Sequence, residues 1–543
     1  LGEELGLVGV ALAFGLLAFI AWRALRVAQR ASGDYGFFLA LGLALGIVLP
    51  FLLIAGGLLG VLPLTGVATP FLSYGRSSMI ANLASVGILL AISSRRSPQV
   101  VTGEFARPAR VLAGVLAAVL AIAVLRAGYL QAWQADATVA SPVITVQGDG
   151  ARRFSYNPRL LAVAETIPRG AVLDRNGIPL ATSRPQDLEK HAATLARLGF
   201  RTPSSCAAEG SRCYPFMGVT YHLLGDARSQ VNWSASNTSF LERDADARLR
   251  GYDDRARLVE VKAPGSTRTD RVLRRDLREL VPLLRHRRRP DHPVVQAFLA
   301  RPRDVRTSID IRLQLRAASH LRSTITEANR RRGAAVVLGT DGEVLAAVSY
   351  PWPEVAASGS ARLQVAAIQP GDESLLDRAR YGLYPPGSSF KLVTAAAALR
   401  KDPALAGRTF TCVPLPGGRV GQRIPGWGRP IRDDAQDRTA HGAVDLERGL
   451  VVSCNAYFAQ LGLALGGPAL QDAAAQFEIP LGQPESASQI RDTLPFAAYG
   501  QGHVLASPLK MARVAATIGN RGRMPDIRWT AGEAEPAEEG REV

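Results

Sequence analysis

The charge-free stretch between Asp34 and Arg76 limits the possible folds of this chain more than any other feature. A bilayer span needs about 20 consecutive apolar residues, and this stretch is longer than one span. We interpret it as a span at about 36–60 followed by an apolar, partly re-entrant loop that contains Pro63 and Pro70. Such a loop is tolerated at membrane depth only where protein or a cavity shelters it.

Further apolar runs predict three more spans, at 5–22, 77–94 and 111–125. The last run is short, but Arg126 can extend toward the interface, where Tyr129 and Trp133 are also favoured. Basic residues cluster at 23–30 and 95–110, and such clusters usually face the cytoplasm. We therefore expect a multi-pass membrane protein, with the chain after about residue 130 outside the cytoplasm. Buried core helices would not explain this regular charge asymmetry.

The composition describes a large and basic chain. Its 543 residues exceed one compact core, so several domains are expected. A net charge of +17 suits a nucleic-acid binder, but no zinc-ligand spacing or RNA-recognition motif accompanies it. Attraction to an anionic membrane or wall explains the charge more simply. We expect no nucleic acid among the partners.

The part after residue 150 has mixed, globular composition. The segment 167–177 predicts a β-hairpin, because Asn176-Gly177 forms a turn between two apolar runs. Residues 185–305 have weak periodicity and are interpreted as an irregular pedestal, whose basic run 285–289 is a solvated face.

A second unit begins near Val305. Residues 309–321 have helical periodicity, and Asp341-Gly342 separates two apolar runs, which predicts a second hairpin. Long alanine-rich helical stretches follow. Strands flanked by helices favour an α/β sandwich with an antiparallel sheet.

Four cysteines are too few for a disulfide scaffold. Cys206 and Cys213 are close enough to pair outside the cell or to remain thiols, whereas Cys412 and Cys454 are expected to be buried thiols. The seven histidines form no ligand-spaced pair, so we expect no metal ion and no cofactor.

The segment around Ser388 carries the first candidate catalytic motif. Pro385, Pro386 and Gly387 interrupt helix formation, and a strong helix-forming run follows, so Ser388 should lie at a helix N-terminus. Lys391 is three residues on and therefore on the same helix face. A serine becomes a nucleophile when a base takes its proton, and burial at a positive helix end lowers a lysine pKa toward that role. The alternative for this string alone is a helix-capping serine and a surface lysine.

The tripeptide Ser453-Cys454-Asn455 is the second candidate motif. It lies between a short apolar run and a helical stretch. The Ser453 hydroxyl can relay a proton between the lysine and a leaving amine, and Asn455 can bind a peptide amide. On its own this tripeptide is also compatible with a simple helix cap.

Longer strings around both motifs resemble class B penicillin-binding proteins. The catalytic strings are LLDRARYGLYPPGSSFKLVTAAAAL (375–399), HGAVDLERGLVVSCNAYFAQLG (441–462) and YGQGHVLASPLKMARVAATIGNRG (499–522). IPRGAVLDRNGIPLATS (167–183) and RCYPFMGVTYHLLG (212–225) resemble the pedestal of that family.

This resemblance implies a penicillin-binding, serine β-lactamase-like transpeptidase fold and D,D-transpeptidation of peptidoglycan stem peptides. Ser388 would attack the D-Ala-D-Ala carbonyl, with Lys391, Ser453 and Asn455 as the other catalytic residues. Asn455, Gly387 and Cys454 would contact the substrate. β-Lactams would acylate the same serine.

The N-terminal part resembles the SEDS glycosyltransferases of the RodA, FtsW and SpoVE type. The strings are EELGLVG (3–9), LPLTGVATPFLSYGRSSMIANL (62–83) and GILLAIS (87–93). That family polymerises lipid II, and its catalytic acidic residue lies upstream of the first string. We therefore expect no polymerase activity from this stretch alone.

We thus predict a fusion of four parts: 1–95 as the last SEDS spans, 96–135 as a linker and anchor, 150–304 as a pedestal and dimerisation domain, and 305–543 as the transpeptidase domain. The superfamily's third motif, Lys-Thr/Ser-Gly, does not occur in the sequence, and the chain begins at Leu1, so we expect truncation at both ends. Expected partners are stem peptides, β-lactams, lipid II for the longer fusion, and divisome or elongasome membrane proteins. The alternatives are a catalytically incomplete wall scaffold and a penicillin-binding sensor.

Overall fold

The computed structural model describes most of the chain, namely residues 2–31, 33–59, 62–63, 66–73, 75–94, 103–148, 150–200, 206, 212–225, 241–262, 269–353, 373–481, 493–531 and 541–543. Two compact units divide the chain. The first comprises Leu1–Leu161 with Arg255–Val281, and the second comprises Ala162–Asp254 with Pro282–Val543. The two units are described separately.

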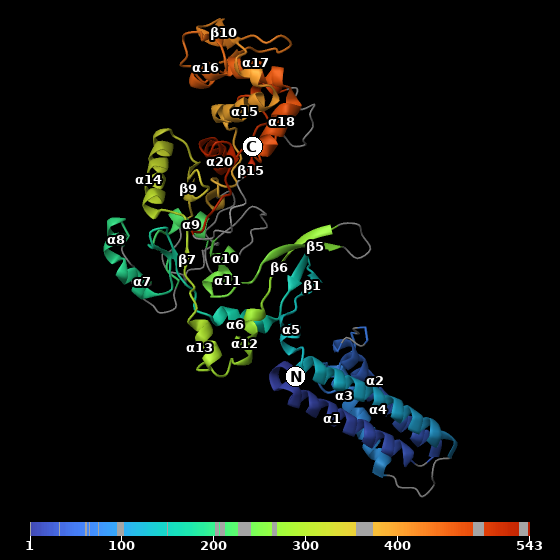
Figure 1. Ribbon diagram of the computed structural model, residues 1–543. Helices are drawn as coiled ribbons and strands as arrows, with labels where there is room; N and C mark the ends of the chain where they lie inside the picture. The colour runs from blue at the N-terminus through green and yellow to red at the C-terminus, as the bar shows by residue number, and fades with distance from the viewer. Residues whose placement is uncertain are drawn as a thin grey trace. The chain divides into compact units, whose positions relative to one another are not determined.

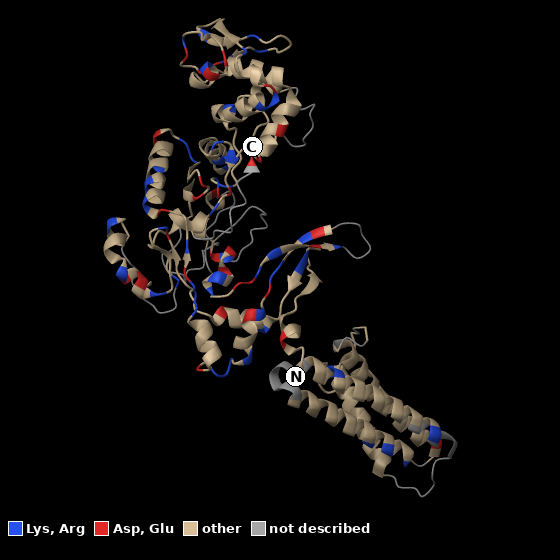
Figure 2. Ribbon diagram, in the orientation of Figure 1, with Lys and Arg blue, Asp and Glu red and all other residues tan. Residues whose placement is uncertain are grey.

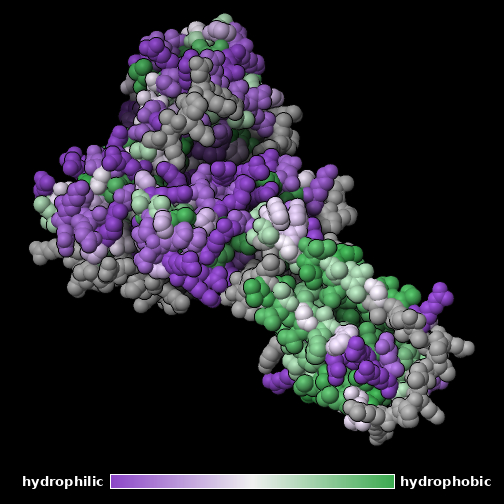
Figure 3. Space-filling model, turned by 60° about the horizontal axis from the view of Figure 1, so that its bottom comes forward, coloured by the Kyte–Doolittle hydropathy of each residue, from purple (hydrophilic) through white to green (hydrophobic). Residues whose placement is uncertain are grey.

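Four long helices begin the first unit: α1 (Gly2–Gln29), α2 (Gly33–Leu58), α3 (Arg76–Ser94) and α4 (Gly103–Ala132) (Figure 1). Within the described residues, three segments are long and apolar enough to cross a membrane, Val8–Gln29, Gly33–Gly57 and Arg76–Ser94, and α4 contains the shorter apolar segment Gly114–Leu130. The helices carry few charges along their length (Figure 2), and their surface is largely hydrophobic (Figure 3). This is a membrane protein, and helices cover all four predicted spans.

The described residues of the predicted loop after α2, 62–63 and 66–73, form no helix and contain a turn at 69–73. The Ser73 hydroxyl accepts a hydrogen bond from the Thr69 backbone N–H at 2.8 Å, and the Ser73 N–H donates to the Thr69 carbonyl at 3.0 Å. Irregular backbone therefore follows α2, as predicted. Whether it re-enters a membrane stays a prediction.

Two hairpins complete the first unit after the short helix α5 (Ala135–Ala140). Strand β1 (Val143–Val146) pairs antiparallel with β2 (Arg152–Ser155), and β5 (Arg257–Lys262) pairs antiparallel with β6 (Thr269–Arg274). The 3-10 helix η2 (Arg278–Leu280) follows β6 and contacts α5.

The predicted hairpin at 167–177 is present in the second unit. Strand β3 (Val172–Leu173) pairs antiparallel with β4 (Pro179–Ala181) and parallel with β7 (Val305–Arg306). Gly177 has a φ of +84°, which a glycine adopts without steric cost. The buried Asp174 carboxylate accepts the backbone N–H groups of Asn176 and Ile178 at 2.8 and 2.7 Å, so the turn is fixed by local chemistry.

Helix α14 (Ile311–Glu327) and the hairpin of β8 (Gly333–Leu338) and β9 (Val344–Tyr350) confirm the other local predictions. Helix α20 (Pro508–Gly519) packs on β8, and α14 packs on β9. The catalytic strings include α15 (Lys391–Lys401), α16 (Leu446–Val451), α17 (Asn455–Leu465) and α20. Helix α18 (Gly467–Gln476) packs against α15 and α17. A four-stranded sheet packs beside α17, in the order β12 (Ile431–Arg432), β11 (Arg419–Gln422), β10 (Phe410–Leu415) and β13 (Gly442–Val444).

Shorter elements connect these parts. They are α6 (Pro158–Thr166), α7 (Pro185–Lys190), α8 (Ala192–Arg197), α9 (Gly218–Leu224), α10 (Leu241–Asp244), α11 (Asp246–Leu249), α12 (Val281–Arg285), α13 (Pro293–Leu299), η4 (Glu373–Leu375), η5 (Gly387–Phe390), η6 (Pro403–Ala406), β14 (Arg523–Met524) and β15 (Arg541–Glu542).

The compact units differ from the predicted domains 150–304 and 305–543. One buried cluster joins Val172 and Leu180 of the first hairpin to Ile311, Val344 and Ala347. The pedestal hairpin therefore shares a core with the strands after residue 305, whereas β5 and β6 group with the membrane helices. Sequence patterns mark the turns between elements but not which elements share a core.

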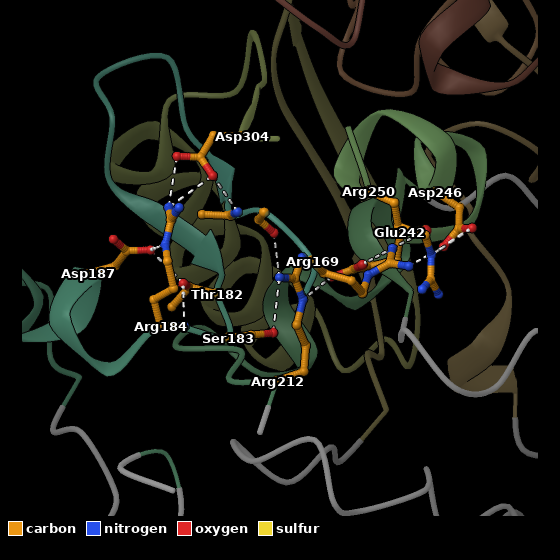
Figure 4. Close-up of polar contacts among 12 residues, drawn as sticks. Arg169, Thr182, Ser183, Arg184, Asp187, Arg212, Glu242, Asp246, Arg250 and Asp304 are labelled. Atoms are coloured by element: carbon orange, nitrogen blue, oxygen red, sulfur yellow. Dashed lines mark hydrogen bonds and ion pairs between the residues drawn. The ribbon is translucent and has the colours of Figure 1, made fainter. Parts of the chain in front are cut away.

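Arginines of the two pedestal strings meet on one buried carboxylate (Figure 4). The fully buried Glu242 is paired with Arg169 at 2.6 Å and with Arg212 at 2.6 Å. Arg169 also pairs with Asp246, which Arg250 contacts at 3.1 Å. Burial acts to lower the pKa of Arg169, but the charges of Glu242 and Asp246 outweigh it, so the pKa is raised.

Cys206 and Cys213 form a disulfide, with 5.4 Å between their Cα atoms. The sequence left this pairing open. Cys412 and Cys454 are buried free thiols, as predicted.

Candidate active site

The turn that presents Ser388 is built from the 3-10 helix η5 and the start of α15. Gly387 has a φ of +58°, and its N–H donates to the Gly500 carbonyl at 2.9 Å. A Cβ atom on Gly500 would lie 2.1 Å from the Gly387 oxygen, so this approach requires glycine at position 500. Ser388 is exposed, whereas Phe390 is fully buried and anchors the turn in the core. The predicted helix start at Ser388 is confirmed.

The segment 498–506 holds this turn from a distant part of the chain. Tyr384 and Ala506 exchange two backbone hydrogen bonds, at 3.1 and 2.9 Å. The Thr394 hydroxyl donates to the Ala498 carbonyl at 2.7 Å from within α15. The sequence showed 499–522 only as a family-like string, and no local pattern revealed this supporting role.

Lys391 brings the two motifs together. Its side chain is 2% exposed, and Nζ donates to the Ser453 carbonyl, to Ser453 Oγ at 2.9 Å and to Asn455 Oδ1 at 2.8 Å. All three acceptors are uncharged. Burial lowers the pKa of Lys391 to about 8, against the opposing attraction of Asp433. The lysine is therefore much closer to neutrality at physiological pH than an exposed lysine.

Ser453 lies in the left-handed region, with a φ of +51°. The Ser453 N–H donates to the Leu450 carbonyl and the Cys454 N–H to the Gly449 carbonyl, at 3.1 and 2.9 Å. This pair of bonds is the Schellman motif that ends many helices, and Ser453 occupies the position that is usually glycine. A non-glycine residue there costs about 1–3 kcal/mol, and such strain is concentrated at functional sites.

Asn455 is the first residue of α17, and both the oxygen and the nitrogen of its side-chain amide are hydrogen-bonded. Its Oδ1 accepts from Lys391, and its Nδ2 donates to the Arg432 carbonyl at 3.1 Å. The Cys454 side chain is fully buried, so any contact of this residue with a substrate would involve its main chain. The structure thus brings Lys391, Ser453 and Asn455 together. Lys391 is also three residues after Ser388 in the sequence, which is about one helical turn.

A cluster of four side chains of metal-ligand type includes Cys454, which lies between Ser453 and Asn455 in the sequence. Asp433 accepts hydrogen bonds from the Cys412 and Cys454 thiols at 3.2 and 3.3 Å, and His441 Nδ1 lies 3.2 Å from the same carboxylate. The second Asp433 oxygen accepts the Ala456 N–H at 3.0 Å, at the start of α17. Burial is the main cause that raises the pKa values of both thiols.

The ligand atoms of these four side chains lie within 4.8 Å of one another. Thiolate, imidazole and carboxylate are the ligands that zinc takes in proteins, so the cluster has the donors for a tetrahedral ion. The expectation of no metal rested on sequence spacing, which does not reveal residues joined only by the fold. That expectation stays a prediction.

Comparison with known proteins places two families on the chain. Residues 1–98 match the FtsW/RodA/SpoVE cell cycle protein family, and residues 333–539 match the penicillin-binding protein transpeptidase domain. The chain thus joins an FtsW/RodA/SpoVE region to a penicillin-binding protein transpeptidase domain. The transpeptidase match includes Ser388, Lys391, Ser453 and Asn455, and the other match includes α1, α2 and α3.

Individual relatives match one region each. The FtsW/RodA/SpoVE region is similar to a probable peptidoglycan glycosyltransferase FtsW of Trichlorobacter lovleyi, with 40% identity over 107 residues, which are 20% of this chain and 28% of the relative. Peptidoglycan D,D-transpeptidase PbpA of Mycobacterium tuberculosis is 37% identical over 215 residues, covering 35% of this chain and 41% of PbpA. The chain therefore spans less than half the length of either relative.

Solved structures of penicillin-binding proteins also align with the chain. The penicillin G acyl-enzyme complex of M. tuberculosis penicillin-binding protein A aligns with 24% identity and a TM-score of 0.46, covering 67% of this chain and 74% of that one. Pseudomonas aeruginosa PBP2 in complex with WCK 5153 aligns with 21% identity and a TM-score of 0.43, covering 69% and 74%.

Proposed function

We propose that the transpeptidase domain is a serine D,D-transpeptidase that cross-links peptidoglycan through an acyl-enzyme at Ser388. The observation that carries this proposal is the position of Lys391. It is a buried lysine with a lowered pKa, three residues from the exposed Ser388, and it contacts the Ser453 and Asn455 side chains of the second motif. A surface lysine beside a capping serine would have neither the burial nor these contacts.

The geometry supports a two-step mechanism. Neutral Lys391 accepts the proton of Ser388, whose Oγ attacks the carbonyl carbon between the two terminal D-Ala residues of a stem peptide. The C–N bond breaks, and the leaving D-Ala amine takes a proton through Ser453 Oγ, which lies 2.9 Å from Nζ. An amine of a neighbouring stem then attacks the ester, forms the cross-link and returns the proton to Ser388.

The other residues have supporting roles in this proposal. Asn455 binds a substrate amide from its position at the start of α17, and the main chain at Gly387 and Cys454 contributes further substrate contacts. Backbone N–H groups at a helix N-terminus suit a developing oxyanion, so the turn at Ser388 can stabilise the tetrahedral intermediate.

β-Lactams are proposed to acylate Ser388, since the aligned M. tuberculosis structure is described as a penicillin G acyl-enzyme complex. The part after about residue 130 is proposed to lie outside the cytoplasm. Membrane proteins of the divisome or elongasome are proposed partners, because one aligned structure is a complex of Helicobacter pylori PBP2 with MreC. Lipid II is the proposed substrate of a longer protein with a complete SEDS part.

Covalent labelling with a fluorescent penicillin tests the nucleophile. The wild-type chain in detergent should form a labelled band, and Ser388→Ala should abolish it. Ser389→Ala is the matched control, because this neighbouring serine is also exposed and its hydroxyl donates only to the Pro386 carbonyl among the described contacts. Labelling that survives Ser388→Ala would overturn the assignment. Release of D-alanine from a stem-peptide mimic then separates a turning-over enzyme from a penicillin-binding sensor.

A further inference from the structure

An arginine-lined cavity of about 360 Å³ lies in the first unit, between α5, the β5–β6 hairpin and η2. This volume is in the range of small-ligand sites. Among the described residues that line it, five are arginines and one is acidic: Arg255, Arg257, Arg274, Arg275, Arg278 and Asp276. The wall therefore carries a strong excess of positive charge, which favours an anionic ligand.

The acidic residue of the cavity is already engaged. Asp276 accepts hydrogen bonds from the Arg278 side chain and from the Arg278 backbone N–H, the latter at 3.1 Å. These bonds, with the field of Arg255, lower the pKa of Asp276 to about 2. Asp276 thus stays ionised, and the hydrogen bonds that the structure describes for its carboxylate come from Arg278, not from Arg257 or Arg274.

The cross-strand arginines are an independent sign of a ligand. Arg257 and Arg274 are register partners on the antiparallel strands β5 and β6. Like charges directly opposite each other destabilise a hairpin. An anion held between the two guanidinium groups would remove this repulsion, and planar guanidinium groups bind phosphate oxygens in pairs.

The cavity begins within a few residues of the membrane helix α4. Tyr129 and Trp133 near the end of that helix are 44% and 82% exposed, as expected for side chains at the membrane interface. Ala137 and Ala140 of α5 line the cavity, and a helix rises about 1.5 Å per residue, so they lie roughly 6–11 Å along the chain from Trp133. The polar layer of a bilayer is about 5–8 Å thick on each side.

The hairpins around the cavity also expose apolar side chains. Leu258 and Leu273, the register pair that follows the arginine pair along the strands and faces the other side of the hairpin, are 64% and 44% exposed. Val143 and Val146 of β1 are 64% and 67% exposed. Exposed apolar groups beside arginines are typical of surfaces that lie against lipid rather than bulk water.

We propose that this cavity binds the phosphate or diphosphate headgroup of an anionic membrane lipid, with Arg257 and Arg274 on the phosphate oxygens. A free phosphate would satisfy the arginines but would leave the neighbouring apolar side chains in water. An acidic protein segment would satisfy the charge, but its position would not need to coincide with the membrane interface. The lipid headgroup accounts for the charge, the apolar surroundings and the distance from α4 together.

Binding of short-chain lipids to the full chain in detergent micelles tests the proposal. The probes are dioctanoyl phosphatidylglycerol, dioctanoylglycerol without phosphate, and inorganic diphosphate, each followed by native mass spectrometry and thermal shift. The phosphatidylglycerol should bind at least roughly tenfold more tightly than dioctanoylglycerol. The double variant Arg257→Gln/Arg274→Gln should lose roughly tenfold or more of this affinity.

The same hairpin offers a matched control. Lys262→Gln/Arg271→Gln removes the same charge from exposed residues on the opposite face of the strands, and should change affinity less than roughly twofold. Equal losses in both variants, or equal binding of the lipid without phosphate, would refute a specific site. Tighter binding of diphosphate than of lipid would reassign the cavity to a soluble anion, and displacement of lipid by a poly-glutamate peptide would reassign it to an acidic protein segment.

Folding of the variants can be separated from binding. Removing the Arg257–Arg274 repulsion should leave the unfolding temperature unchanged or higher. If the double variant nevertheless fails to fold, the single variant Arg257→Gln provides the same test, with an expected loss of roughly threefold. A folded single variant with unchanged affinity would contradict the proposal.

Discussion

Two cationic clusters of the second unit, one around Glu242 and one around Lys391, differ in the charge of their partners. In the pedestal, Arg169 and Arg212 both pair with the carboxylate of Glu242, and the pKa of Arg169 is raised. In the transpeptidase domain, Lys391 is buried but donates to two neutral side chains and a carbonyl, and its pKa is lowered to about 8.

Burial alone therefore does not decide whether a cationic side chain keeps its proton. A carboxylate partner stabilises the charged form of the arginine and so makes the cluster structural. Neutral partners leave the desolvation cost uncompensated, so the lysine can lose its proton at a modest pH. The more distant Asp433 only moderates this effect.

Removing the lysine should have the largest effect. We expect Lys391→Met and Lys391→Arg each to slow acylation by fluorescent penicillin by roughly 10²–10⁴-fold, since the first lacks a base and the second keeps a charge that it does not release. Stopped-flow or gel-based acylation kinetics measure this. Lys401→Met is the matched control, because Lys401 is an exposed lysine on the same helix that donates to the Leu465 carbonyl. Rescue by arginine would mean that the charge, not the base, matters.

Removing the pedestal carboxylate should affect stability instead. Glu242→Gln removes the only carboxylate that the structure describes for the buried Arg212 and leaves Arg169 with Asp246 alone, so the free energy of unfolding should fall by about 3–5 kcal/mol. Denaturant unfolding of the full chain in detergent measures this. The control is Asp526→Asn, which removes the charge of an 81% exposed carboxylate that pairs with Arg513. It should lower the free energy of unfolding by less than about 1 kcal/mol. A similar cost for both variants would mean that the buried Glu242 contributes no more to stability than an exposed carboxylate does.

The pH dependence of acylation should sharpen the comparison. Lys391 must be neutral to accept a proton, and its pKa of about 8 means that its neutral fraction rises by about tenfold between pH 7 and pH 9. The acylation rate should therefore rise with pH and level off above pH 9. A rate that is flat from pH 7 to pH 9 would argue against Lys391 as the base, provided that the Ser389→Ala control shows the wild-type profile.

Ser453→Gly should have the smallest effect on stability and the opposite sign. Glycine suits the left-handed conformation of this position, so the free energy of unfolding should increase by about 1 kcal/mol. The acylation rate should fall, because the hydroxyl beside Lys391 is lost. A paired measurement of unfolding and acylation on this variant is required. Loss of stability together with activity would mean that Ser453 has a structural role only.

Sequence patterns predicted the features that depend on neighbouring residues. The turns at Gly177 and Gly342 and the helix start at Ser388 follow from local turn chemistry. The membrane helices were predicted by their apolar cores, although α4 begins at Gly103 rather than 111, because backbone hydrogen bonding continues beyond the apolar run.

Contacts between distant residues could not be predicted in this way. Glu242 lies 73 residues from Arg169 and 30 from Arg212, and Asp433 lies 21 residues from each buried cysteine. No periodicity links such residues, because the fold alone brings them together. The resemblance of whole strings placed Lys391 beside Ser453 and Asn455, but it gave no indication of the Asp433 cluster or of the hairpin core shared across residue 305.

The backbone bonds from Gly500 to Gly387 and from Ala506 to Tyr384 also set an order of events during biosynthesis. A ribosome has to complete the chain through Ala506 before the turn around Ser388 can be fixed. By then the membrane helices near the N-terminus have long left the exit tunnel. A nascent chain that stops earlier carries Ser388 and Lys391 without the backbone hydrogen bonds that fix the turn around them. The reactivity toward penicillin that we propose can therefore arise only after residue 506 has been added to the growing polypeptide.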